Sequence, residues 1–277
     1  MVKQGDRNLS TYLKSLIFCG IIAGALCVSG GFAARAETPV DLELLFAVDV
    51  SDSIDRREAR LQRNGYIAAL TDPAVLRAAA GGPLGRIAIS YVEWAGAGHY
   101  RVLVDWTVLD GPESGRAIAE RLAAAPLAVS PRTSISAAVA RSVRRFEGNG
   151  FTGTRRIIDV SGDGPNNQGV LVTEARDDAV AAGVTINALA ILPDPNEPED
   201  RGGLRTLDLY YEDCLIGGAG AFVLVAEGRA AFAEAIRRKL IMEIAGIEAP
   251  AVRLQRVAGR ERPSCNIGEW MWFGPTR

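Results

Sequence analysis

The chain has 277 residues, of which 48% are hydrophobic, and its 31 basic and 33 acidic side chains give a net charge of −2. This length and apolar fraction fit one large folded domain or two small ones and argue against a disordered chain. A near-neutral charge without a basic tract argues against a nucleic-acid-binding protein. One histidine, His99, and four cysteines exclude a zinc finger, a multi-histidine metal site and a disulfide-dense scaffold. Any metal site should therefore use mainly oxygen ligands.

The first 36 residues have the pattern of a secretory signal peptide. Basic residues precede an apolar run from Leu16 to Val28, and small residues follow as far as Ala36. This pattern combines a basic N-terminal region, a short apolar stretch and an A-x-A cleavage motif. It predicts cleavage after Ala36 and a periplasmic or secreted protein. An uncleaved membrane anchor is the alternative, because the uncharged stretch is about 20 residues long, although four glycines dilute it.

Removal of this leader would take away four of the 31 basic and one of the 33 acidic side chains, which leaves 27 basic and 32 acidic ones. Two cysteines would remain, Cys214 and Cys265. In an oxidising compartment two thiols are more often paired than free. We therefore expect a disulfide that ties the C-terminal tail to the last part of the domain. Two buried, reduced cysteines are the alternative.

Strand and helix patterns alternate from residue 40 to residue 246. The expected strands are 40–48, 85–92, 100–106, 155–160, 184–191 and 221–226, and the expected helices are 55–80 with a break at Asp72-Pro73, 111–124, 134–146, 171–182, a short piece at 204–214, and 229–244. Such alternation predicts an α/β fold, a doubly wound and mostly parallel six-stranded sheet with helices on both faces. The gap between 85–92 and 100–106 is too short for a crossover helix, so these two strands should pair antiparallel at a sheet edge. The expected organisation is a signal peptide at 1–36, one domain at 37–247 and a tail at 248–277.

Oxygen-bearing side chains gather where three of these elements meet. Asp49, Ser51 and Ser53 directly follow the first strand, Thr133 precedes the helix at 134–146, and Asp163 follows the strand at 155–160. In a doubly wound sheet, ligands bind outside the carboxyl ends of the strands. Carboxylate and hydroxyl oxygens suit hard divalent ions such as Mg²⁺, Mn²⁺ or Ca²⁺.

In these residues the sequence resembles the von Willebrand factor type A (vWA) family, over about residues 40–246. The metal-ion-dependent adhesion site of that family has the pattern D-x-S-x-S, then a Thr, then an Asp, which Asp49, Ser51, Ser53, Thr133 and Asp163 fill in order. The resemblance implies that Ser51 and Ser53 ligate the ion directly and that Asp49, Thr133 and Asp163 complete its shell, directly or through water. It also implies an open position that takes an acidic residue from a partner. The chain is similar as well to a group of exported bacterial proteins with this domain, a resemblance that points to no particular ligand.

The resemblance therefore implies an exported, divalent-cation-dependent protein-binding module for adhesion or scaffolding, and not an enzyme. Its partner would be a protein or peptide that offers a carboxylate, without nucleic acid and without a membrane after signal cleavage. A metal-dependent hydrolase that uses the same ion and a purely structural metal site are the alternatives. Two positions depart from the family pattern: Gly162 stands where many relatives have Thr, and Arg132 stands where a small residue is common.

Other features have simpler interpretations. The residues after Asp49 could cap the following helix. His99 should be exposed in the turn between the edge strands, and Glu93 with Trp94 should pack at the sheet edge. The acidic loop at 194–200 should be solvated. Trp270 and Trp272 should dock on the chain itself.

Overall fold

The computed structural model describes residues 36–194, 204–228, 231–246 and 261–274. The expected leader, apart from Ala36, and the acidic loop, apart from Asp194, lie outside these ranges. Within them, no helix is both long enough and apolar enough to cross a membrane.

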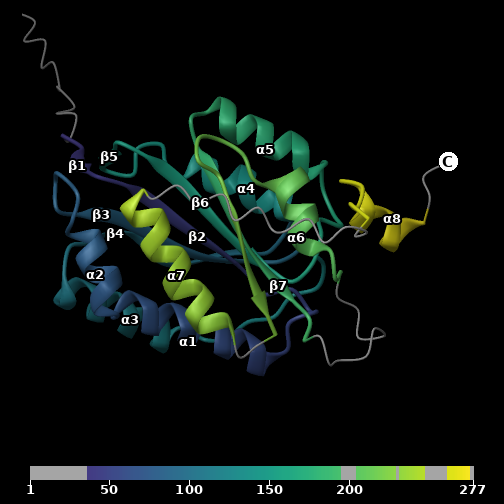
Figure 1. Cartoon of the computed structure of the whole chain (residues 1–277), viewed down its shortest axis with the longest axis horizontal. Helices are drawn as coiled ribbons and strands as arrows, with labels where there is room; N and C mark the ends of the chain where they lie inside the picture. Colours follow the sequence, from purple (N-terminus) through teal and green to yellow (C-terminus); the bar gives the residue numbers. More distant parts are fainter. Residues whose placement is uncertain (1–35, 195–203, 229–230, 247–260, 275–277) are drawn as a thin grey trace, which may run out of the picture. The chain divides into compact units, whose positions relative to one another are not determined.

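A six-stranded sheet with the order β4-β3-β2-β6-β7-β8 forms the centre of the fold (Figure 1). Only the β3–β4 pair is antiparallel, and β4 lies at the edge of the sheet, so the predicted sheet is confirmed. Its strands are β2 (Glu43–Asp49), β3 (Ile87–Trp94), β4 (Tyr100–Leu109), β6 (Arg156–Gly162), β7 (Thr185–Leu192) and β8 (Val223–Glu227).

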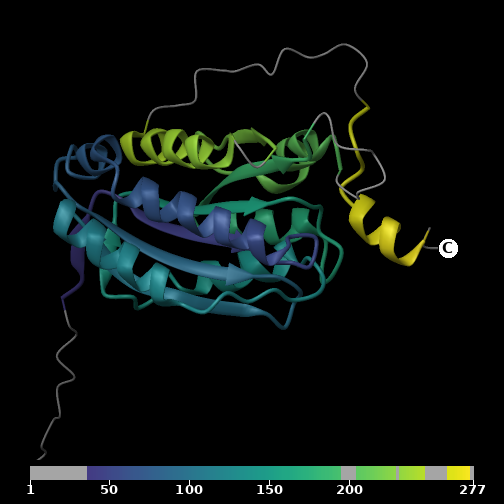
Figure 2. The same ribbon diagram turned by 90° about the horizontal axis from the view of Figure 1, so that it is seen from below.

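Helices cover both faces of this sheet (Figures 1 and 2). One face packs against α1 (Arg56–Leu70), α2 (Pro73–Ala79), α3 (Pro112–Ala124) and α7 (Phe232–Ala245); the other packs against α4 (Ile135–Arg144), α5 (Val172–Ala181), α6 (Leu207–Tyr210) and the π-helical turn η2 (Tyr211–Leu215). All seven residues of β2 are buried, as the continuous apolar run of a central parallel strand predicts. The expected break at Asp72-Pro73 is also present, because the Asp72 carboxylate caps α2 and Pro73 is its first residue.

The N-terminal strand differs from the prediction. Residues 40–48 form two strands, β1 (Thr38–Val40) and β2, because the chain turns at Asp41, whose carboxylate accepts hydrogen bonds from the Leu84 and Arg86 amides. β1 pairs in parallel with β5 (Phe151–Gly153) in a separate two-stranded sheet. The sequence pattern missed β5 because three residues are too few to show an alternation.

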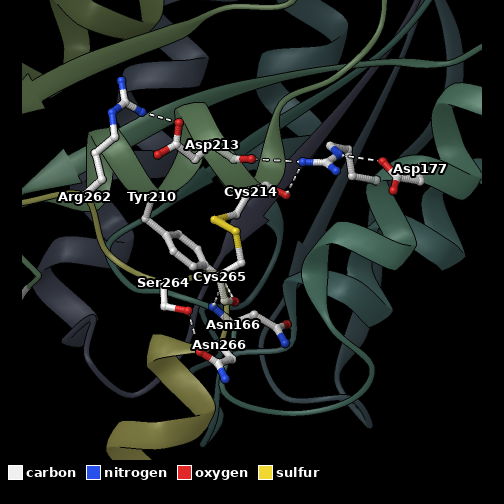
Figure 3. Close-up of a disulfide and its surroundings, with 10 residues drawn as sticks. Asn166, Asp177, Tyr210, Asp213, Cys214, Arg262, Ser264, Cys265 and Asn266 are labelled. Atoms are coloured by element: carbon white, nitrogen blue, oxygen red, sulfur yellow. Dashed lines mark hydrogen bonds and ion pairs between the residues drawn. A yellow bond between two sulfur atoms is a disulfide. The ribbon is translucent and has the colours of Figure 1, made fainter.

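The tail also contains an element that the sequence pattern missed, the helix α8 (Ile267–Phe273). A seven-residue helix is too short to show a clear hydrophobic period. Cys214 in η2 and Cys265 just before α8 form a disulfide, which confirms the predicted bond (Figure 3). The bond lies beside Tyr210, whose hydroxyl accepts a hydrogen bond from the Asn166 amide.

The strand order places a ligand site. From β2 the chain builds the sheet outward through β3 and β4, and from β6 it builds outward in the opposite direction through β7 and β8. Open α/β sheets bind ligands at such a switch point, outside the carboxyl ends of the two central strands. Here those ends are Asp49 on β2 and Gly162 on β6.

A cluster of charged groups is buried between the sheet and α7. Lys239 is fully buried and forms ion pairs with Asp159, at 2.5 Å, and with Glu243. Asn187 donates a hydrogen bond to the Glu243 carboxylate at 2.9 Å. Burial raises the pKa of Glu243 to about 8; the nearby Asp159 adds to the rise and Lys239 opposes it. One positive and one negative charge balance in this cluster when Glu243 is protonated.

This raised pKa predicts a pH-dependent stability. The unfolded chain releases the Glu243 proton near pH ~4.3, whereas the folded chain holds it up to about pH 8. The free energy of unfolding should therefore fall as the pH rises through this window. Glu243→Gln keeps the neutral shape and should lose this part of the pH dependence, which urea unfolding at both ends of the window measures. Glu234→Gln, on the exposed face of α7, is the matched control, and equal pH slopes for wild type and Glu243→Gln would contradict the assignment.

Candidate metal-binding site

Asp49 is the last residue of β2, and its two carboxylate oxygens differ in their hydrogen bonding. The residue is fully buried, and its Oδ1 accepts a hydrogen bond from the Ser51 amide at 2.7 Å. Its Oδ2 is buried and has no hydrogen-bond partner within the described residues. An unpaired buried carboxylate oxygen is costly, so this atom marks a position suited to a cation or a donor.

Hydroxyl groups connect this turn to the end of β6. The Oγ atoms of Ser51 and Ser53 lie 3.0 Å apart, and the Ser53 hydroxyl donates to Asp163 Oδ1 at 2.8 Å. Ser51 is buried, whereas Ser53 is exposed. The structure thus brings four of the five predicted residues into one continuous cluster, with its open side at Ser53.

Thr133 lies on a loop that adjoins this cluster. The Ser130 amide donates to the Val50 carbonyl at 3.0 Å, and Ser130 pairs with Ser51 in an isolated bridge. The Thr133 amide donates to Asn167 Oδ1, and the Asn167 amide donates to the Thr133 carbonyl, both at 2.9 Å. The described part of the chain shows no hydrogen bond from the Thr133 hydroxyl to the other four residues. The structure therefore fixes the backbone of Thr133 beside the cluster without joining its side chain to it.

The two carboxylates of the cluster disfavour each other's charge. Burial raises the pKa of Asp49 well above its usual range, and the nearby Asp163 raises it further. Burial also raises the pKa of Asp163 to about 6; the Ser53 hydrogen bond opposes this rise, and the charges of Glu58 and Asp52 add to it. A divalent cation placed among these groups would favour their ionised forms.

The donor set fits a hard divalent ion. It offers two carboxylates and the hydroxyls of two serines, with Thr133 on the adjoining loop, and such oxygens are the ligands of Mg²⁺, Mn²⁺ and Ca²⁺. Among the described residues no group of three or more His, Cys, Asp or Glu side chains could hold a metal. The candidate site differs from such a group because it combines only two carboxylates with hydroxyl oxygens.

The structure gives a physical reason for the departure at Gly162. A Cβ atom at this position would lie 2.7 Å from the Tyr211 hydroxyl and 3.0 Å from Asp49 Oδ2. Tyr211 is buried, and its hydroxyl donates to the Gly164 carbonyl at 3.1 Å. The space that a Thr side chain would need is therefore taken by a tyrosine from η2, which the sequence pattern did not associate with the site.

The simpler interpretations have mixed outcomes. The helix-cap interpretation of the residues after Asp49 is wrong, because Asp55 caps α1 with its own side chain. Glu93 and Trp94 are buried packing residues, as expected, but β3 is not an edge strand, because it lies between β2 and β4. Arg63 Nε donates to Glu93 at 3.1 Å. The expectation that His99 is exposed is wrong, because its side chain is only partly exposed.

His99 is half-buried, its Nε2 atom is buried, and burial lowers its pKa.

The expected docking of the tail tryptophans on the chain itself is confirmed in part. The Arg132 guanidinium lies 4.1 Å from the centre of the Trp272 ring, but Trp270 and Trp272 are 50% and 52% exposed.

The chain matches the family model described as protein of unknown function (DUF1194) over residues 39–248. No curated protein matches it in sequence. Several solved structures share the fold. Proximal thread matrix protein 1 from the mussel byssus matches at 14% identity and a TM-score of 0.53, over 76% of this chain and 49% of the mussel chain.

A second structure of the mussel protein, described as having a zinc-occupied MIDAS motif, matches at 15% identity and a TM-score of 0.50, over 76% of this chain and 49% of the other. The pilus adhesin SpaC from Lactobacillus rhamnosus GG matches at 13% identity and a TM-score of 0.54, over 76% of this chain and 31% of the adhesin. The chain thus spans about half of the mussel protein and about a third of the adhesin. These likenesses show the fold, which is the vWA fold that the resemblance implied.

The close approach of Gly162 and Tyr211 predicts a specific stability effect. Gly162→Ala should lower the free energy of unfolding by about 1–3 kcal/mol, the usual cost of overpacking, because the new methyl group meets the Tyr211 hydroxyl. In a Tyr211→Phe background most of this cost should disappear, which a double-mutant cycle of chemical unfolding measures. An equal cost in both backgrounds would show that the hydroxyl is not the obstacle.

Proposed function

The chain belongs to the family of proteins of unknown function DUF1194. For this chain we propose an exported module for divalent-cation-dependent protein binding. The ion would be held by Asp49, Ser51, Ser53, Thr133 and Asp163. Its open position would take a carboxylate from a partner protein. Mg²⁺ is the first candidate ion, with Mn²⁺, Ca²⁺ and Zn²⁺ as alternatives; zinc is included because of the mussel structure.

One observation carries this proposal. Asp49 Oδ2 is buried at the carboxyl end of β2 and has no hydrogen-bond partner in the part of the chain that the structure describes. Asp163 lies at the end of β6, and the Ser51 and Ser53 hydroxyls bridge the two strand ends. Two carboxylates held together at the switch point of the sheet cost free energy unless a cation balances them. The same geometry leaves the exposed Ser53 side of the cluster open to a ligand.

The bound ion would supply an electrophilic centre that attracts one more carboxylate. Neutral hydroxyls would be among its direct ligands, and a carboxylate of Asp49 or Asp163 that contacted the ion only through water would leave part of its positive charge unbalanced. An acidic side chain from a partner could then replace a water molecule. The residues of this chain would orient the ion and leave one side of it accessible.

The surroundings favour binding over hydrolysis. A hydrolase would need a base that is free to activate water. Glu58 lies close to Asp163, but its carboxylate accepts a hydrogen bond from the Asp55 amide at 2.7 Å in the cap of α1. His99 makes no contact with the cluster in the part of the chain that the structure describes.

Export is supported by two independent features. The N-terminal pattern is that of a signal peptide, and the Cys214–Cys265 disulfide is a bond that persists mainly in oxidising compartments.

Calorimetric titration of the metal-stripped protein with Mg²⁺, Mn²⁺, Ca²⁺ and Zn²⁺ tests the proposal. We expect one saturable site for at least one ion. Ser53→Ala and Asp163→Asn should weaken its affinity by about tenfold or more, equivalent to ~1.4 kcal/mol. Asp52→Asn is the matched control, because it removes a neighbouring exposed carboxylate that is not in the donor set. Absence of binding, or equal affinities for all variants, would contradict the proposal.

The same samples separate an open site from a structural one. Proton relaxation of water in the Mn²⁺ complex reports whether the bound ion keeps exchangeable water. We expect bound water and a folded protein after chelation. A closed shell, together with unfolding on chelation, would instead indicate that the ion only holds the loops together.

A further inference from the structure

Four consecutive residues at the end of α8 carry large, exposed apolar side chains. Trp270, Met271, Trp272 and Phe273 are 50%, 59%, 52% and 64% exposed. Isolated exposed apolar side chains are common on soluble proteins, but a contiguous group of this kind usually marks an interaction site. Tryptophan is also among the residues that most often dominate binding energy at protein interfaces.

α8 is fixed to the loop that follows β6. Gly268 packs so closely on the Asn166 carbonyl that a Cβ atom there would lie 2.0 Å from its oxygen. The Asn166 side chain donates to Glu269 at 2.6 Å and accepts a hydrogen bond from the Ser136 amide at 3.0 Å. The disulfide at Cys265, two residues before α8, adds a covalent tether (Figure 3). α8 and its exposed aromatic residues are therefore attached to the loop that begins with Asp163.

Arg132 connects α8 to the other side of the candidate metal site. It directly precedes Thr133 and has a φ of 71°, a conformation that is unfavourable for a residue with a side chain. Its guanidinium lies 4.1 Å from the centre of the Trp272 ring and 5.4 Å from that of Phe273. Its Nη1 atom is buried and has no hydrogen-bond partner among the described residues. Strained residues gather at functional sites, and the positive charge of the guanidinium attracts anions.

We propose that Arg132 and the exposed rings of Trp272 and Phe273 in α8 form a second contact surface of the same binding site. This inference rests on the proposed function and specifies its partner: a protein segment that carries an apolar or aromatic side chain beside the carboxylate that binds the ion. The ion and Arg132 would attract the acidic group, and the rings of α8 would cover the neighbouring apolar side chain.

Charge distinguishes this partner from a membrane surface. Anionic lipid is attracted by clusters of Lys and Arg, whereas the candidate site is surrounded by Asp49, Asp52, Glu58 and Asp163, and the whole chain has a net charge of −2. Acidic groups dominate this region, so a single carboxylate that binds at a metal ion fits it better than a layer of anionic lipid.

Selection of displayed random peptides on the purified protein, with Mg²⁺ and with chelator, tests the inference. The ion affinity of every variant is measured first by calorimetry. Wild-type protein should enrich, only with Mg²⁺, peptides that carry Asp or Glu next to Trp, Phe, Leu or Met. The affinity of such a peptide should exceed that of its glycine-substituted form by about tenfold. Trp272→Ala with Phe273→Ala should enrich acidic peptides without this neighbour preference, and Leu84→Ala, which removes a 39% exposed side chain at the other end of β3, should behave as wild type.

The outcomes separate the two proposals. If calorimetry shows no ion binding, the proposed function fails. The proposed contact surface is overturned if the ion binds but no peptide is enriched. It is also overturned if the wild type shows no preference for an apolar neighbour, or if the double variant Trp272→Ala with Phe273→Ala keeps that preference. The proposed contact surface would also be overturned if the wild type, but not this variant, bound phosphatidylglycerol vesicles and showed no peptide preference. That result would assign α8 to a membrane.

Discussion

The placement of Asp49 and Asp163 at adjacent strand ends is the constraint on which the rest of the site depends. The strand order puts both carboxylates at the switch point of the sheet, and burial raises the pKa of each. The serine hydroxyls between them provide neutral oxygens in a continuous chain. The glycine at position 162 lets the Tyr211 hydroxyl and Asp49 Oδ2 approach the backbone at the end of β6 closely. Each of these features favours a cation between the two acids.

The loops around the site are already connected to one another without an ion. The Ser130 amide binds the Val50 carbonyl, Asn167 exchanges two hydrogen bonds with Thr133, and Asn166 joins the start of α4 to α8. This network agrees with the expectation that chelation leaves the fold intact, because the loops do not need the ion to stay together. It also explains how a tail helix can become part of the same surface.

Much of the fold could be predicted from sequence because its signals are local. Apolar runs and turn residues placed all six main strands and the antiparallel edge, and the two cysteines that follow the leader predicted the disulfide. The order of Asp49, Ser51, Ser53, Thr133 and Asp163 identified the candidate donors. β5 and α8 are too short to have a period. The role of Tyr211 beside Gly162, and of Trp272 beside Arg132, depends on contacts between distant parts of the chain, which no local pattern contains. For the same reason the sequence could not show that the Thr133 hydroxyl lies outside the hydrogen-bonded chain.

Anomalous diffraction from crystals of the protein soaked in Mn²⁺ would locate the ion and its ligands together. We expect one strong peak between the ends of β2 and β6, with the Ser51 and Ser53 hydroxyls as direct ligands, Asp49, Thr133 and Asp163 around it, and one position occupied by water. A cluster without a peak, or an ion whose ligands exclude both serines, would contradict it.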